Sequence, residues 1–321
     1  MQILIPDIGR VQPSGSWETS PIVHGPGVRP YIAMSDHLML FPNDDMSTVV
    51  WDMEKDRRAG VLEGHTSPVF LAAITDCGRW AATYSVKETG TAKVWNMDTM
   101  QCKASLTSSR NNSMCCLKDR LLLGSRDGPI DIWDISVSTP VASLDLQGHV
   151  GHVWSICASE THNVVLSGSK DKSMRLWDVR TGRCVRTMEG HTRSFSSVSM
   201  DSACRTGVSG SSDKTVKTWD LGTGKCIDTF QHDYIVTSVG LHENGSMFFS
   251  LDMDRCLRFF TAVDADQRAT KTVNLKAVCG VESTPDDASC TFWNMKVAAK
   301  RDLSALATSF VIDDSFKTFM W

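Results

Sequence analysis

The chain has 321 residues, of which 41% are hydrophobic and 22% are charged. This composition is typical of a folded globular protein and excludes a disordered or fibrous one. The formal net charge of −4 gives no overall basic character, so we do not expect nucleic acid as the main partner.

Tryptophans that are followed by Asp or Asn recur along the chain at intervals of 38 to 44 residues. They are Trp51-Asp52, Trp95-Asn96, Trp133-Asp134, Trp177-Asp178 and Trp219-Asp220. The same register continues to Phe260 and Phe319, each of which follows an aspartate by six residues. A period of this length indicates a repeat architecture, and we count seven units.

The fourth and fifth units have closely similar sequences, LSGSKDKSMRLWDVRTGRC at 166–184 and VSGSSDKTVKTWDLGTGKC at 208–226. Short runs of apolar and β-branched residues alternate in them with Gly, Asp and Ser, which is typical of strands joined by turns. For the fourth unit this pattern predicts a small sheet of four strands at 153–158, 164–167, 174–177 and 184–188. We expect no helix of useful length.

These units resemble the WD40 repeat family, because Gly64-His65, Gly148-His149 and Gly190-His191 open units whose third strands end in Trp-Asp or Trp-Asn. The resemblance implies an all-β fold, a seven-bladed β-propeller of four-stranded antiparallel sheets around a central channel. The whole chain, 1–321, is then a single propeller domain.

The family's repeats carry a hydrogen-bonded tetrad of His, Ser or Thr, Asp and Trp, which two units contain in full. The matching residues are His149, Ser167, Asp171 and Trp177, and then His191, Ser209, Asp213 and Trp219. Buried polar groups of these kinds are costly to leave unpaired, so a satisfied tetrad locks a turn against a strand. We interpret them as architecture, and not as a hydrolase site, because they recur in register with the blades.

Other units depart from this pattern. Blade two has His65, Thr83 and Trp95 but no Asp at the matching turn, and blade three has Leu123 in the place of the hydroxyl. For blade six we expect the tetrad residues His232, Ser250 and Asp254, with Phe260 in the place of Trp.

The last blade lacks a fourth strand, because only two residues follow Phe319. By resemblance to the family, a segment of the N-terminus completes it, and we expect this closing strand within residues 1–12, from ILIP at 3–6 or IGRVQ at 8–12. Residues 276–290 are interpreted as a loop inserted before the last strands.

A closed propeller suits binding, and the resemblance implies a non-catalytic scaffold for protein–protein interaction. The family's contact positions on the narrow face of the ring hold aromatic and basic side chains of the types that dominate interfaces. The candidate partner-binding residues are Arg29, Phe70, Arg126, His152, Trp154 and Lys170. The alternative is that the aromatic rings only pack between neighbouring blades.

A second hypothesis comes from the Trp-Asp-x-Arg sequence at 177–180. It resembles the box by which some WD40 proteins dock on the adaptor of cullin-type ubiquitin ligases as substrate receptors. Arg180 is then the docking residue, on the face opposite the narrow face. An exposed Arg in this loop is also common in propellers that have no ligase role.

The sequence has no phosphate-cradling glycine loop, metal-ligand cluster or nucleophile elbow, so we expect no enzyme activity, no metal site and no cofactor. Eleven cysteines without paired Cys-x-x-Cys motifs favour reduced thiols. We find no secretory signal or membrane-spanning run and expect a cytoplasmic or nuclear protein that binds proteins or peptides, as a monomer or as a subunit of a larger complex.

Overall fold

The computed structural model describes residues 32–261, apart from gaps at 43–45, 56, 86–89, 109–110, 138–140, 243 and 255. Outside that span it describes seven strand segments, at 3–4, 10–11, 16–18, 271–274, 296–299, 306–312 and 315–320. The described residues form β-strands and turns and no helix, which confirms the predicted all-β class.

Seven four-stranded antiparallel sheets make up most of the structure. We number these sheets as blades in the order of their innermost strands. Blade one consists of β4 (Ala33–Met34), β5 (Leu38–Pro42), β6 (Thr48–Asp52) and β7 (Arg57–Leu62). Blade two consists of β8 (Val69–Ile74), β9 (Trp80–Ser85), β10 (Thr91–Asn96) and β11 (Gln101–Thr107). Blade three consists of β12 (Asn111–Leu117), β13 (Arg120–Ser125), β14 (Ile130–Asp134) and β15 (Val141–Leu146).

The remaining blades follow the same order in the chain, except that the last takes one strand from the N-terminal region. Blade four consists of β16 (Val153–Ser159), β17 (Val164–Ser169), β18 (Ser173–Asp178) and β19 (Arg183–Glu189). Blade five consists of β20 (Phe195–Met200), β21 (Thr206–Ser211), β22 (Thr215–Asp220) and β23 (Lys225–Gln231). Blade six consists of β24 (Val236–Leu241), β25 (Met247–Asp252), β26 (Cys256–Thr261) and β27 (Lys271–Asn274). Blade seven consists of β28 (Lys296–Ala299), β29 (Leu306–Ile312), β30 (Ser315–Met320) and β3 (Ser16–Glu18).

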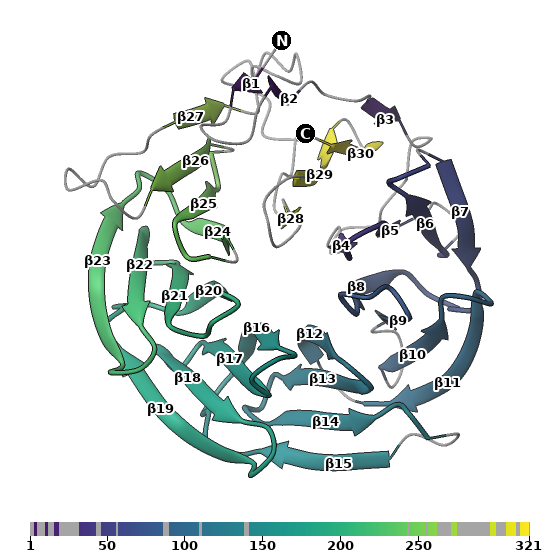
Figure 1. Cartoon of the computed structure of the whole chain (residues 1–321), viewed down its shortest axis with the longest axis horizontal. Coiled ribbons are helices and arrows are strands. Elements are labelled where there is room, and N and C mark those ends of the chain that lie inside the picture. Colours follow the sequence, from purple (N-terminus) through teal and green to yellow (C-terminus); the bar gives the residue numbers. More distant parts are fainter. Residues whose placement is uncertain are drawn as a thin grey trace.

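The sheets stand around a central axis, with the first strand of each blade nearest the centre (Figure 1). These inner strands contact one another in sequence, from β4 through β8, β12, β16, β20 and β24 to β28, and β28 in turn contacts β4. Each sheet therefore has a neighbour on both faces, and its unpaired edges belong to the innermost strand, at the centre, and to the outermost strand.

The hydrophobic core lies between neighbouring sheets and not within any one of them. Leu166 and Met174 of blade four pack with Phe195 and Trp219 of blade five in one cluster. Val208 of blade five packs with Phe248 and other residues of blade six in the next. Because burial of apolar area is the main stabilising contribution, a single blade has little stability without its neighbours.

The Ser-Gly-Ser sequences of the second strands allow this close packing. A Cβ atom at Gly168 would lie 2.8 Å from Val198 Cγ1 and 2.9 Å from Phe195 Cβ of the next blade. At Gly210 it would lie 2.6 Å from Val236 Cγ1. The repeated glycine is therefore required by the approach of the adjacent inner strand.

The strand beside β30 differs from our expectation. Ser16, Trp17 and Glu18 of β3 pair with residues 317–319, whereas β1 (Ile3–Leu4) pairs with β2 (Arg10–Val11) in a separate two-stranded sheet. The prediction that residues 1–12 supply the closing strand was therefore wrong in position, because the backbone groups of 3–4 and 10–11 bond to each other. The predicted loop at 276–290 lies outside the described residues.

Candidate partner-binding face

The tetrad residues of blade four form one continuous hydrogen-bonded chain. Trp177 Nε1 donates to Ser167 Oγ over 2.8 Å, and His149 Nε2 lies 2.8 Å from the same oxygen. His149 Nδ1 lies 2.8 Å from Asp171 Oδ2. Since a carboxylate only accepts, Nδ1 carries the hydrogen and Nε2 accepts from the serine hydroxyl. The chain connects the loop before β16 to the turn between β17 and β18.

Asp171 is the anchor of that turn. Its side chain is 13% exposed and also accepts hydrogen bonds from the backbone N–H groups of Val150 and Ser173 and from the Ser173 hydroxyl. Burial on its own would raise the pKa of Asp171, but the hydrogen bonds from His149, Ser173 and Val150 outweigh it and hold the pKa well below the usual 3.8. The carboxylate therefore stays ionised and directed inward.

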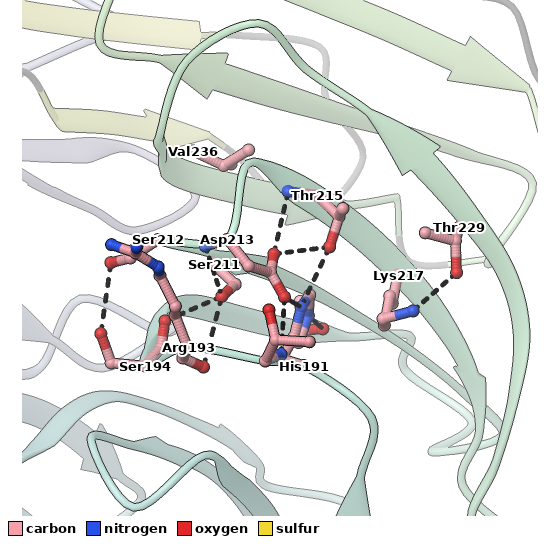
Figure 2. A network of polar contacts seen from close by, with 12 residues as sticks. His191, Arg193, Ser194, Ser211, Ser212, Asp213, Thr215, Lys217, Thr229 and Val236 are labelled. Carbon is pink, nitrogen blue, oxygen red and sulfur yellow. Dashed lines mark hydrogen bonds and ion pairs between the residues drawn. The ribbon is translucent and has the colours of Figure 1, made fainter.

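Blade five repeats this arrangement around His191 and Asp213 (Figure 2). His191 Nδ1 lies 2.8 Å from Asp213 Oδ2, its Nε2 lies 2.8 Å from Ser209 Oγ, and Trp219 Nε1 donates to Ser209 over 2.8 Å. Burial opposes the charge of Asp213, but hydrogen bonds from His191 and Thr215 lower its pKa. These contacts give the tetrads a structural role, and their polar atoms are used within the fold.

Blades two and three show what the departures from the pattern cost. In blade two, Thr83 Oγ1 accepts from Trp95 Nε1 over 2.8 Å and lies 2.7 Å from His65 Nε2. In blade three, where Leu123 replaces the hydroxyl, the buried indole nitrogen of Trp133 has no hydrogen-bond partner among the described residues. An unpaired buried N–H is destabilising.

His65 makes stability depend on pH. Burial, together with the nearby charge of Lys93, lowers the pKa of His65 from 6.5 to about 4. Its neutral form therefore contributes stability that is fully present above pH 6.5 and is lost as the pH falls from 6.5 towards 4. We expect the urea midpoint of unfolding to fall less between pH 6.5 and pH 4 in His65→Gln than in the unmodified chain. Parallel declines in the two proteins would contradict this assignment.

Blade six uses a different aspartate from the one that the repeat register predicts. His232 Nδ1 lies 3.3 Å from Asp252 Oδ2, and its Nε2 lies 3.0 Å from Ser250 Oγ, so the prediction of Asp254 was wrong. Ser250 and Asp252 are two residues apart in one strand and share a face, which places both beside the imidazole.

Arg258 completes the cluster of blade six and was not among the predicted residues. Its guanidinium contacts His232, lies 3.2 Å from Asp252 Oδ2 and 3.4 Å from Asp233 Oδ2. Arg258 pairs directly across the sheet with Ser250. The sequence signal for this cluster was an arginine in the strand opposite Ser250, together with an aspartate two residues after that serine.

The narrow face is the end of the sheets that carries His152 and the turns at 170–172 and 212–214. Here His152 and Trp154 stack, with ring centroids 5.3 Å apart and planes at 30°. Asn112 of blade three bonds through Nδ2 to His152 Nδ1 at 3.0 Å and accepts from Arg126 Nε over 3.1 Å. The backbone N–H of Lys170 donates to the carbonyl of His152 over 2.8 Å. The structure thus brings four of the predicted residues together.

This His152 cluster, which we define as Asn112, Arg126, His152, Trp154 and Lys170, is accessible and positively charged. Arg126 and Lys170 are exposed, and the other three residues are half-buried. Partial burial lowers the pKa of His152, and the charges of Lys170 and Arg126 act in the same direction. The imidazole is therefore neutral near pH 7 and offers a flat ring surface beside two cations.

The other predicted contact residues lie apart from this cluster or outside the described residues. Phe70 is half-buried at the matching position of β8, two sheets away from Trp154. Arg29 is not among the described residues. Arg180 lies on the loop between β18 and β19, at the end of blade four opposite the turn at 170–172, with its side chain 80% exposed.

The described residues contain no group of three or more His, Cys, Asp or Glu side chains that could hold a metal ion. Among these same residues, no helix is long and apolar enough to cross a bilayer. Their Asp, His and Ser constellations are the tetrads described above.

Comparison with known proteins identifies the repeat. The family model "WD domain, G-beta repeat" matches residues 138–178, 182–220 and 224–261. "Mitochondrial division protein 1" of Kluyveromyces lactis is 28% identical over 186 residues, and the protein of the same name in Schizosaccharomyces pombe is 28% identical over 198 residues. "F-box/WD repeat-containing protein 10" of Mus musculus is 42% identical over 71 residues.

The matches to the Kluyveromyces lactis, Schizosaccharomyces pombe and mouse proteins cover 46%, 49% and 22% of the chain, respectively. They cover 25%, 30% and 7% of the relatives, so the chain spans less than a third of the length of each. Each matched range covers the outermost strand of one blade and the three inner strands of the next. The three ranges thus include the hydrogen-bonded His clusters of blades four, five and six. The chain therefore contains three WD40 repeats, at 138–178, 182–220 and 224–261.

Proposed function

We propose that the protein is a non-catalytic interaction scaffold that binds partner proteins or peptides through the narrow face of its propeller. The observation that supports this most directly is the His152 cluster. It combines an aromatic stack with two exposed cations at the junction of blades three and four.

The cluster has the properties of an interface centre. Trp and Arg side chains bury large areas and also form hydrogen bonds, and such residues contribute most to binding energy at protein interfaces. The hydrogen bonds of Asn112 hold the His152 ring and the Arg126 side chain, which lowers the conformational entropy that these two side chains lose on binding. The WD40 family, which mostly serves as a platform for protein complexes, provides further support.

Substitution of the cluster tests this proposal. We expect the double variant Trp154→Ala and Lys170→Glu to lose proteins that the unmodified chain retains in affinity purification, by about tenfold or more in recovered amount. The matched control is Arg183→Ala, an exposed residue at the opposite end of blade four. Melting temperatures must show that both variants are folded. Equal recovery by the double variant and the control would contradict a binding site here.

A second candidate function is that of a substrate receptor of a cullin-type ubiquitin ligase, with docking through Arg180. The favouring observation is that the Arg180 guanidinium is largely exposed, 3.8 Å from Asp178, on the face that leaves the His152 cluster free. The name of the mouse relative, F-box/WD repeat-containing protein 10, includes an F-box and agrees with this candidate. Co-purification with the ligase adaptor that is abolished by Arg180→Ala would support it, and no association would end it.

A further inference from the structure

The narrow face carries an uneven distribution of charge. The turns and loops of blades three to five on this face contain five exposed basic residues. They are Arg126, Lys170, Lys172, Arg193 and Lys214. We call these five the cationic sector. Among the residues that the structure describes, none of the five forms an ion pair within 4 Å of a carboxylate, whereas Arg180 and Arg258 both do.

The acidic residues of the same turns do not neutralise this sector. Asp171 and Asp213 are 13% and 7% exposed, and each is directed inward to its histidine. Asp127 is the one exposed carboxylate in these described turns and loops, and Glu189 ends the outermost strand of blade four. The tetrads therefore draw the acids of each turn into the fold and leave the flanking lysines at the surface.

The turns fix the backbone from which two of these cations project. Lys172 and Lys214 adopt the same left-handed backbone conformation, with φ of 68° at both, in turns closed by hydrogen bonds to the carbonyls of Ser169 and Ser211. Blades four and five thus present the same cationic turn side by side. In blade six the loop before β24 carries Asp233, whose side chain is 84% exposed and lies 3.4 Å from Arg258.

From this charge distribution we infer that the cationic sector binds an extended acidic segment of a partner protein, one that carries several Asp or Glu side chains. This inference rests on the proposed function and names the class of partner for the same face. An extended segment spans about 3.3 Å per residue, so carboxylates spaced along it can meet cations on three successive blades. The His152–Trp154 stack lies beside Asn112 and its partner Arg126, and it can pack against an apolar residue of that segment.

Peptide binding tests the inference directly. The probe is a fluorescein-labelled 15-residue peptide of Glu, Asp, Gly and Ser with one Leu, in three unrelated orders, measured by anisotropy. We expect each acidic peptide to bind at least tenfold more tightly than the matching peptide in which Gln and Asn replace Glu and Asp. The affinity of the acidic peptide should fall at least fivefold when the salt concentration rises from 50 to 300 mM. The double variant Lys170→Glu and Arg193→Glu should lower the affinity about tenfold or more. The matched control, Arg183→Glu with Lys225→Glu at the opposite end of blades four and five, should not.

The possible outcomes separate this inference from the proposed function. If acidic and neutral peptides bind equally, or if a basic peptide or a single-stranded oligonucleotide binds more tightly, the acidic partner class is wrong. In that case recovery of partners that depends on Trp154 still supports the scaffold. If the opposite-end variant weakens the peptide as much as the narrow-face variant, the placement on the cationic sector is overturned.

Discussion

Removal of residues 1–20 is expected to lower the melting temperature by about 6 °C or more, whereas removal of residues 1–12 is expected to change it little. The first deletion takes away β3, whose three residues pair with 317–319 of β30. Loss of about three backbone hydrogen bonds, at about 1 kcal/mol each, corresponds to about 3 kcal/mol. For a domain of more than about 150 residues, 1 kcal/mol corresponds to about 2 to 4 °C.

The shorter deletion serves as the matched control, because among the described residues it removes the two-stranded sheet of β1 and β2 and leaves β3 in place. An isolated two-stranded sheet is marginally stable in water and contributes little. Differential scanning calorimetry of the three proteins provides the comparison. A large effect of the shorter deletion, or equal melting temperatures for all three proteins, would contradict the pairing of β3 with β30.

Arg258→Met is expected to lower the free energy of unfolding by about 3 kcal/mol. The side chain of Asp252 is fully buried, and Arg258 is the cation that faces it, 3.2 Å away. Without the guanidinium, an ionised carboxylate is left inside blade six. The control is Arg205→Met, an exposed arginine of blade five, which should change stability by less than about 0.5 kcal/mol.

A second substitution separates the loss of the ion pair from a general packing defect. Blades four and five have Ser169 and Ser211 at the position of Asp252, so Asp252→Ser introduces a residue that the fold accepts there. We expect Asp252→Ser to restore more than half of the stability lost in Arg258→Met. Urea unfolding of the two single variants and the double variant measures this coupling. Additive losses would contradict it.

The sequence predicted the architecture well where the repeat is regular. The four strands of blade four lie within two residues of the predicted ranges, because each range is a run of apolar and β-branched residues between turn residues. The contacts of both complete tetrads also follow from register alone. Their hydrogen bonds join residues at constant offsets, such as the 18 residues that separate each histidine from its serine.

The repeat register failed where the choice of partner is not local. Residues 3–6, ILIP, are the stronger strand formers, yet β3 pairs with β30, because strand pairing over 300 residues is decided by the position of the chain in the ring. In blade six the repeat register predicted Asp254, the aspartate of the turn after β25. The structure uses Asp252 instead, since an arginine from the next strand can neutralise it there.

The candidate site shows the same limit. The sequence indicated His152, Trp154, Lys170 and Arg126 one position at a time, from a likeness to contact positions in the family. Their assembly into one cluster depends on Asn112, which no motif identifies and which joins blade three to His152. The cationic sector became visible only when the structure showed that the neighbouring acids are directed inward.

The most direct test of the account is amide hydrogen exchange of the chain, free and bound to a partner whose recovery depends on Trp154. If the narrow face is the binding surface, the bound partner will slow exchange at 149–154, 169–172 and 192–196 and leave 179–182 unchanged. Slower exchange at 179–182 together with unchanged exchange at 149–154 would contradict the account.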